Sequence, residues 1–135
     1  RDFIHIYEKL IVTKSWWDTV DMLAGKLVAH HFQRFPDMVP DFPNKWMDSG
    51  NMWLQRSAII FQLKYREKTD SDLLFGYILR MKDSKEFFIQ KAAGWALREY
   101  SKRNWEVVLD FIENNELAPL TKREGLKWMK SKGVL

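Results

Sequence analysis

Apolar residues recur at the start of the chain with the spacing of an amphipathic helix. The stripe follows the i, i+3, i+4, i+7, i+8 pattern of one helical face and comprises Phe3, Ile6, Tyr7, Leu10 and Ile11. We therefore predict a first helix over residues 3–12 that ends near Thr13. A second helix follows to about Phe35, and either Thr13 or Ser15 can cap it. One face of this second helix carries Val20, Leu23, Leu27 and His31.

The clearest loop in the chain follows the second predicted helix. Its three prolines, Pro36, Pro40 and Pro43, lack backbone donors and disfavour helix at the residues before them. Beyond this loop the pattern predicts helices at about 44–48, 51–66, 70–82, 85–103, 105–114 and 121–132. With only 6 Gly and 4 Pro in 135 residues, the pattern predicts an all-α fold.

Several of these helices begin with residues that favour a helix start. Asp70 and Ser84 precede apolar periodic segments and are predicted N-caps. Thr121 with Glu124 three residues later has the form of a capping box. These starts divide the second half of the chain into short helices joined by short turns, as in stacked helix pairs.

A faint internal repeat supports stacked helix pairs. Residues 56–65, RSAIIFQLKY, align with residues 91–100, KAAGWALREY, at a spacing of 35, and the same spacing before Arg56 leads to Asp21. Asp21, Arg56 and Lys91 would then occupy equivalent positions on the second helices of three pairs and form a row along one surface. The alternative is a coincidental likeness inside an irregular helical bundle. The repeat favours a solenoid of antiparallel helix pairs.

Composition and charge narrow the class of protein. Hydrophobic residues make up 46% and charged residues 30%, as in a folded globular chain, and 135 residues suit one domain over 1–135. The formal charge of +4 mildly favours a polyanionic partner. Without Cys there is no disulfide framework, thiolate nucleophile or Cys-ligated zinc. No signal-peptide pattern or membrane-length apolar run occurs, so we expect a cytoplasmic protein without membrane partners.

Trp17 and Asp21 are the first candidates for chemistry. Their i, i+4 spacing places an indole and a carboxylate on one helical face, and Trp16 adds a second indole one step round. The alternative is that both tryptophans are core and Asp21 is a solvated helix residue. The row favours function, because Asp21 interrupts positions otherwise held by Arg56 and Lys91. A carboxylate there would weaken nucleic-acid binding unless it had another task.

A second candidate surface is a basic stripe with one embedded aromatic residue. Lys91, Trp95, Arg98 and Lys102 follow one another at i, i+4, i+7 and i+11, so the cations can neutralise phosphates while the indole packs on a sugar or base. The alternative is a solvated helix face with Trp95 in the core. Arg56 has the planar fork that suits a phosphate, and its alternative is a structural ion pair.

Other chemistries find no support in the sequence. His30 and His31 are adjacent and diverge on a helix, so they cannot share a metal, and we predict neither a metal nor a cofactor. Gly-rich phosphate loops, nucleophile elbows and HExxH segments are absent, which argues against nucleotide hydrolysis, serine-esterase chemistry and zinc proteolysis. The remaining tryptophans are predicted to pack between helices, and these are Trp46, Trp53, Trp105 and Trp128.

The sequence resembles the bacterial DNA alkylation repair glycosylases of the AlkD type. The segments that carry the likeness are 15–21 (SWWDTVD), 51–65 (NMWLQRSAIIFQLKY), 68–70 (KTD), 86–101 (EFFIQKAAGWALREYS) and 117–124 (LAPLTKRE). The resemblance implies an all-α, HEAT-like helical-repeat solenoid, curved into a superhelix, whose basic concave face holds duplex DNA. It also implies excision of N3- and N7-alkylated purines by hydrolysis of the N-glycosidic bond, in base excision repair.

The resemblance also assigns roles to residues. The catalytic carboxylate of the family falls on Asp21, its flanking aromatic residues on Trp17 and Trp95, and its phosphate-contacting arginine on Arg56. We further expect Trp16, Lys91, Arg98 and Lys102 to contact DNA. Members of the family extend before the point that matches Arg1, so residues 1–135 are expected to be the C-terminal portion of a larger monomeric glycosylase domain. The alternative function is a noncatalytic HEAT-like scaffold that binds nucleic acid or protein.

Overall fold

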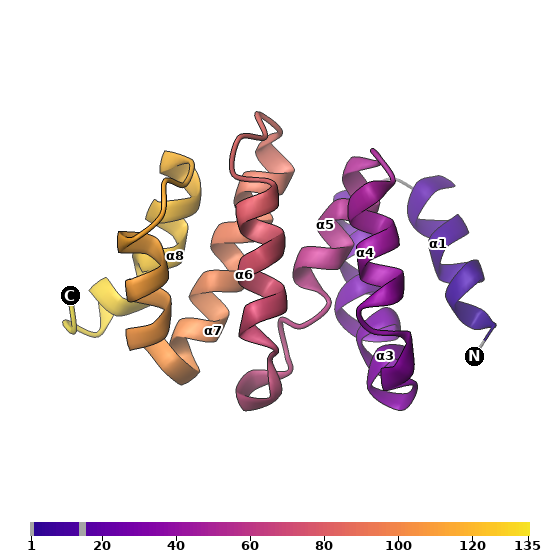
Figure 1. Ribbon diagram of the computed structural model, residues 1–135, viewed down its shortest axis with the longest axis horizontal. Coiled ribbons are helices and arrows are strands. Elements are labelled where there is room, and N and C mark those ends of the chain that lie inside the picture. The colour runs from indigo at the N-terminus through magenta and orange to yellow at the C-terminus, as the bar shows by residue number, and fades with distance from the viewer. Residues whose placement is uncertain (1, 14–15) are drawn as a thin grey trace. The chain divides into compact units, whose positions relative to one another are not determined.

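The computed structural model describes residues 2–13 and 16–135, and within these ranges it contains helices and turns but no strand (Figure 1). The all-α prediction is confirmed. The chain divides into two compact units, unit 1 over Arg1–Phe61 and unit 2 over Gln62–Leu135. Antiparallel helix pairs within each unit agree with the predicted helical-repeat class. The curvature of a superhelix and the single domain remain predictions.

Unit 1 consists of two helix pairs. Helix α1 (Phe3–Thr13) precedes a long second helix made of α2 (Trp17–Met22), the π-helical segment η1 (Leu23–Val28) and α3 (Ala29–Arg34). The 3-10 turn η2 (Pro36–Met38) and a cis Val39–Pro40 bond lead to α4 (Asp41–Asp48) and α5 (Met52–Ile60). This order positions α2 and α5, which contact each other inside unit 1.

Aromatic rings fill the core of unit 1. The ring of Phe32 lies 5.6 Å from that of Trp46 and 5.1 Å from that of Phe61, all three being buried. The packing role predicted for Trp46 is confirmed, and its indole Nε1 donates to Oε2 of Glu8 at 2.7 Å. Burial of three large rings is a major stabilising term for a unit of this size.

Two details of the second helix differ from the sequence prediction. Thr13 is the last residue of α1, and its hydroxyl donates to the Lys9 carbonyl, so it does not cap the next helix. Ser15 lies outside the described residues, and Trp16 occupies the N-cap position without a side-chain cap. Of the four residues predicted to share one face, Val20, Leu23 and His31 are buried, whereas Leu27 is exposed. The cause is η1, where i→i+5 bonding adds a residue to the turn and shifts the helical register.

The bounds of α4 and α5 also differ. Helix α4 begins at Asp41 rather than residue 44, because Pro43 falls in the first turn, where a missing backbone donor costs nothing. Helix α5 ends at Ile60 rather than residue 66. Beyond it the chain turns, and the side chain of Gln62 both accepts from the Asp70 amide and donates to the Asp70 carbonyl. These bonds hold a turn where apolar periodicity alone predicts continued helix.

Unit 2 contains the 3-10 turn η3 (Arg66–Lys68) and helices α6 (Ser71–Arg80), α7 (Phe87–Glu113) and α8 (Pro119–Ser131). Non-helical angles at Asn104, φ −149° and ψ 69°, break α7 into two helices, which confirms the boundary predicted between 103 and 105. The Asp70 cap is also confirmed, since its side chain accepts from the Leu73 amide.

Two predicted helix starts in unit 2 are wrong. Ser84 lies before the N-cap, which is Glu86, although its hydroxyl accepts from the Glu86 amide. The capping box at Thr121 and Glu124 does not exist, because α8 already begins at Pro119, a residue favoured at the first helical position. Both side chains instead contact α7, where the Thr121 hydroxyl donates to the Gln90 carbonyl at 3.0 Å.

Close packing of α8 on α7 defines the second unit. The Phe75 ring of α6 stacks on Phe111 of α7 at 4.2 Å, and Leu97, Val108 and Met129 are fully buried. Trp53 in unit 1, and Trp105 and Trp128 in unit 2, are half-buried, as expected of packing residues with an accessible edge. In the part of the chain that the structure describes, no helix has the length and apolar character needed to cross a membrane.

Candidate catalytic site and nucleic-acid interface

Helix α2 carries the first candidate site. Trp17 is its first residue, with 53% of its surface exposed, and Asp21 follows one turn later, with 14% of its side chain exposed. Trp16 is more exposed still. The two tryptophans are therefore surface residues, and the alternative that both are core is wrong.

Asp21 is held by a bidentate ion pair with Arg56 of α5. The Arg56 Nε donates to Oδ1 at 2.8 Å and Nη2 donates to Oδ2 at 3.0 Å, while only 4% of the arginine side chain is exposed. The two positions separated by one repeat are thus neighbours within unit 1. The fork fixes the plane of the carboxylate and uses one lone pair of each oxygen, which leaves the others able to accept hydrogen bonds.

This geometry bears on the predicted role of Arg56. The buried fork faces Asp21, so the structure contains the structural ion pair considered from the sequence. Direct contact between Arg56 and a phosphate stays a prediction. The ion pair with Arg56 fixes the orientation of the Asp21 carboxylate and leaves part of it exposed. The exposed indole of Trp17 lies on the same helix.

The basic stripe on α7 meets an acidic residue of α8. Lys91 Nζ lies 2.7 Å from Glu124 Oε1, and Arg98 Nη1 lies 3.6 Å from Glu124 Oε2. Lys127 Nζ also contacts this carboxylate, at 2.8 Å from Oε2. Hydrogen bonds from Lys127 and then Lys91 lower the pKa of Glu124 from 4.5 to about 2. The stripe is therefore anchored rather than simply solvated.

The other members of the stripe have different surroundings. Lys102 pairs with Glu99 on its own helix at 3.0 Å, and both side chains remain partly exposed. Trp95 is half-buried in unit 2. Its predicted place beside Asp21 involves both units and stays a prediction.

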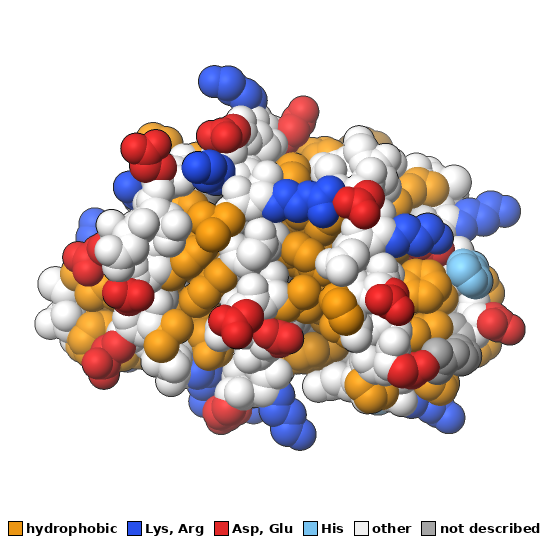
Figure 2. Space-filling model, in the orientation of Figure 1, with side chains coloured by type: hydrophobic (Ala, Val, Ile, Leu, Met, Phe, Trp, Pro, Cys, Tyr) orange, Lys and Arg blue, Asp and Glu red, His pale blue; other side chains and the backbone are white. Residues whose placement is uncertain are grey.

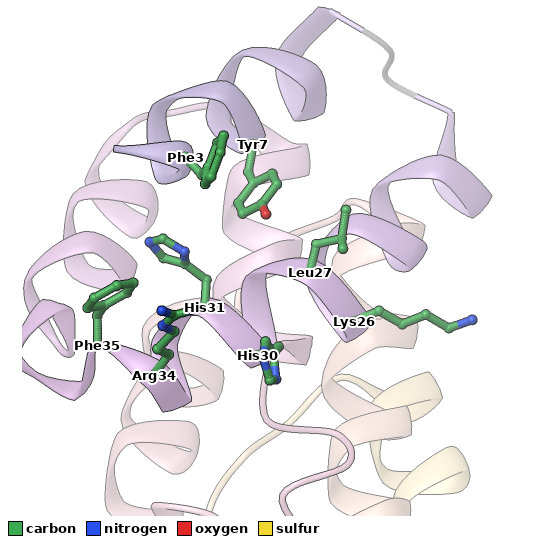
Figure 3. A pocket seen from close by; sticks show the side chains of 8 residues that line it. All are labelled: Phe3, Tyr7, Lys26, Leu27, His30, His31, Arg34 and Phe35. Atoms are coloured by element: carbon green, nitrogen blue, oxygen red, sulfur yellow. The ribbon is translucent and has the colours of Figure 1, made fainter. Parts of the chain in front are cut away.

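Unit 1 also contains a cavity of about 440 Å³, which Figure 3 shows between α1 and the η1–α3 part of the second helix. Aromatic rings and basic side chains line it: Phe3, Tyr7, Lys26, Leu27, His30, His31, Arg34 and Phe35. The lining contains no carboxylate. The cavity suits an anion or an aromatic group, but it contains none of the residues predicted for catalysis.

The two adjacent histidines behave as the helical geometry predicts. His31 is buried, with its ring 5.0 Å from that of Phe35 and 5.8 Å from that of Tyr7, whereas His30 is exposed. Among residues 2–13 and 16–135, no group of three or more His, Cys, Asp or Glu side chains is placed to hold a metal ion.

The face of the molecule in Figure 2 carries a mixed surface. Acidic and basic side chains alternate there over exposed apolar atoms on both units. Such mixing gives no continuous positive surface on this face. Around Glu124, by contrast, three basic side chains lie within 4 Å of one carboxylate.

Comparison with known proteins decides the family. The family model described as DNA alkylation repair enzyme matches residues 1–129. This chain belongs to the DNA alkylation repair enzyme family. The resemblance inferred from the sequence segments is confirmed.

One solved structure shows how this alkylation repair family member relates to a longer chain. A predicted DNA alkylation repair enzyme from Enterococcus faecalis is 36% identical, with a TM-score of 0.85, over 91% of this chain and 57% of that chain. The chain thus spans little more than half the length of that relative. No curated protein matches the sequence.

Sequence reasoning missed two functional candidates in this family member, Glu124 and Lys127. The sequence pattern assigns Glu124 to a capping box and gives no role to Lys127. The i, i+3 spacing of the two residues was a signal for a local pair. Their contact with α7 could not be anticipated, because it depends on how closely α8 approaches that helix.

Proposed function

We propose that this family member is a DNA glycosylase that removes cationic N3- and N7-alkylated purines from duplex DNA. Membership of the DNA alkylation repair enzyme family supports a DNA substrate and an enzymatic role. The observation that carries the proposal is the Asp21 carboxylate, which Arg56 fixes in orientation while part of it faces solvent beside Trp17.

One carboxylate is sufficient for this reaction. An N3- or N7-alkylated purine already carries a positive charge, so it leaves with the electrons of the N-glycosidic bond without being protonated first. Positive charge then develops on the deoxyribose, where Asp21 stabilises it electrostatically. Water adds to the anomeric carbon and releases a proton, and Asp21 orients this water. The reaction needs neither a metal nor a cofactor.

The remaining residues of the proposed site bind and position DNA. Trp17 of unit 1 and Trp95 of unit 2 each pack against the sugar-phosphate backbone. Arg56 acts as a positioning residue by holding both carboxylate oxygens of Asp21. Phosphates are contacted by the exposed cations and by the indole that precedes α2, namely Lys91, Arg98, Lys102 and Trp16.

The first test compares two aspartates of α2. Base release from methylated duplex DNA should fall about 10²–10³-fold in Asp21→Asn, because the charge that stabilises the sugar cation is lost. Asp18→Asn is the matched control, since Asp18 lies on the same helix, is exposed, and accepts a hydrogen bond from the Thr19 amide at the helix start. Equal rates for the two variants would remove Asp21 from the catalytic role.

A second test separates catalysis from structure. Asp21→Asn leaves the buried Arg56 guanidinium without its charged partner, so some activity loss could follow from instability. The double variant Asp21→Asn with Arg56→Gln replaces the ion pair by two neutral amides and should recover much of the thermal stability. Base release should stay low in the double variant. Recovery of both properties together would assign the pair a structural role only.

One observation favours a noncatalytic scaffold as the second candidate function. The Asp21–Arg56 pair links α2 to α5, and a link of this kind is sufficient to explain why both residues are present. This alternative predicts binding to DNA or protein without base release. A DNA affinity that barely changes between about 50 and about 200 mM salt would favour a protein partner, because phosphate neutralisation is strongly salt-dependent.

A further inference from the structure

Glu124 gathers three cations from two helices of unit 2. Lys91 and Arg98 reach it from α7 at 2.7 and 3.6 Å, and Lys127 reaches it from α8 at 2.8 Å. Only 5% of the Glu124 side chain is exposed, whereas the cations retain 40%, 32% and 49% exposure respectively. The carboxylate is therefore the buried centre of a positive surface.

The backbone brings these groups together through a close approach of α8 to α7. A Cβ atom at Gly94 would lie 2.6 Å from the Glu124 Cβ and 3.1 Å from the Thr121 carbonyl oxygen, so only glycine permits this spacing. The Thr121 hydroxyl bond to the Gln90 carbonyl fixes the start of α8 against the same helix. The position of Glu124 is thus set by the helix packing rather than by its own rotamer alone.

The charge balance of the cluster suits a phosphate. Three cations and one carboxylate leave a local charge of +2, and a lysine ammonium has three donors, of which the carboxylate does not use all. Since the pKa of Glu124 is lowered to about 2, the carboxylate is ionised at any pH used for DNA binding. Cations already held in place lose less side-chain freedom when they bind an anion.

We propose that Lys91, Arg98 and Lys127 form a binding cluster for a DNA backbone phosphate and that Glu124 is its positioning residue. The proposal rests on the proposed function in that DNA is the substrate. It adds α8 to the DNA-binding surface and gives Glu124 a role opposite to that expected of an acidic residue near DNA. Lys127 contacts the phosphate directly, whereas Glu124 acts through the cations.

The first experiment measures the affinity of the intact protein for an unmodified duplex at several salt concentrations. Lys127→Gln should lower the slope of log affinity against log salt by about 0.9 and weaken binding about 10-fold at 0.1 M salt, as expected for one lost phosphate contact. The matched control is Lys122→Gln on the same helix, roughly 140° round from Lys127. Both variants lose one positive charge, so equal effects would overturn the cluster.

The second experiment tests Glu124 by the direction of the effect. Glu124→Gln removes a negative charge, so simple electrostatics predicts tighter DNA binding. A positioning role predicts weaker binding, by about 10-fold if one phosphate contact is lost. Tighter binding by this variant would overturn the positioning role. Thermal unfolding of each variant identifies any that do not fold. If Glu124→Gln does not fold, Lys127→Gln decides the proposal, because the Lys127 side chain is exposed and its replacement leaves the core intact.

These outcomes can be separated from those for the glycosylase itself. If Lys127→Gln weakens DNA binding but the unaltered protein releases no alkylated base, the cluster stands and the enzymatic proposal fails. If the protein releases base while Lys127→Gln binds as tightly as Lys122→Gln, the glycosylase stands and the cluster fails.

Discussion

The two units use ion pairs between neighbouring helices in opposite ways. In unit 1 the buried partner is the cation, since Arg56 is 4% exposed and Asp21 is 14% exposed. In unit 2 the buried partner is the carboxylate of Glu124, at 5% exposure, and its three cations extend into solvent. The partner that the packing buries determines which sign of charge the surface presents.

This difference suits the two tasks that the proposed glycosylase activity requires. A carboxylate edge in unit 1 suits a sugar on which positive charge develops, whereas a surface of charge +2 in unit 2 suits a phosphate. An ion pair between neighbouring helices can therefore present either a carboxylate or a group of cations to solvent. Variants that remove one partner of each ion pair test whether the loss of stability depends on how deeply the remaining partner is buried.

The largest effect on stability is expected in unit 1. Arg56→Gln leaves the mostly buried Asp21 without its cation and should lower the free energy of unfolding by about 3–5 kcal/mol. Lys91→Gln should cost less than about 1 kcal/mol, because Lys127 and Arg98 still neutralise Glu124 and the lysine is partly exposed. Urea unfolding of both variants measures the difference. Similar costs would mean that burial does not distinguish the two pairs.

Acid should weaken unit 2 through Glu124. In the unfolded chain this carboxyl takes up a proton near pH 4.5, whereas the folded form keeps its charge down to about pH 2. The unfolded state thus binds more protons between these values, so stability is present above pH 4.5 and is lost as the pH falls towards 2. The loss amounts to about 3 kcal/mol.

The control for this acid effect is Glu124→Gln, which has no carboxyl at this position. Unfolding measured at several pH values should show a smaller decline in the variant than in the unaltered protein. Parallel curves would mean that the three cations do not stabilise the charged form of Glu124. Because both proteins contain the same other carboxylates, the difference between the two pH curves isolates the contribution of Glu124.

Much of the fold follows from the sequence because helices are determined by local patterns. Local sequence patterns located the helices of the described residues, and the boundary predicted between residues 103 and 105 falls at Asn104. The errors come from contacts that periodicity does not contain. Helix α5 ends early where the Gln62 side chain binds the Asp70 backbone, and the π-helical turn of η1 displaces Leu27 from the core.

From the sequence, only the part of the candidate site whose residues are separated by the 35-residue spacing could be predicted. The 35-residue spacing placed Asp21 and Arg56 at equivalent positions, and the structure makes them direct partners. Glu124 escaped prediction because its partners depend on the distance between α7 and α8. That distance is set by Gly94, whose importance cannot be recognised without knowing which residue faces it.

Gly94 offers a sharper test of how unit 2 is built. Gly94→Ala would force its Cβ against Glu124 and Thr121, which should cost about 1–3 kcal/mol and weaken DNA binding by displacing the cluster. The control is Gly76→Ala in α6, where a Cβ meets no atom within 4 Å and alanine should stabilise the helix by about 0.5–1 kcal/mol. Thermal unfolding that changes equally in both variants would contradict the close approach.

The smallest change in stability is expected at Trp17, the exposed indole beside the unit 1 carboxylate. Trp17→Ala should alter the free energy of unfolding by no more than about 0.5 kcal/mol, because the ring is largely in solvent. Trp46→Ala should cost about 3–5 kcal/mol, since that ring is buried at the centre of unit 1. Base release should nevertheless fall in Trp17→Ala at unchanged stability. A Trp17 variant that retains full activity would leave unit 1 with an oriented carboxylate but no aromatic partner for the sugar-phosphate backbone.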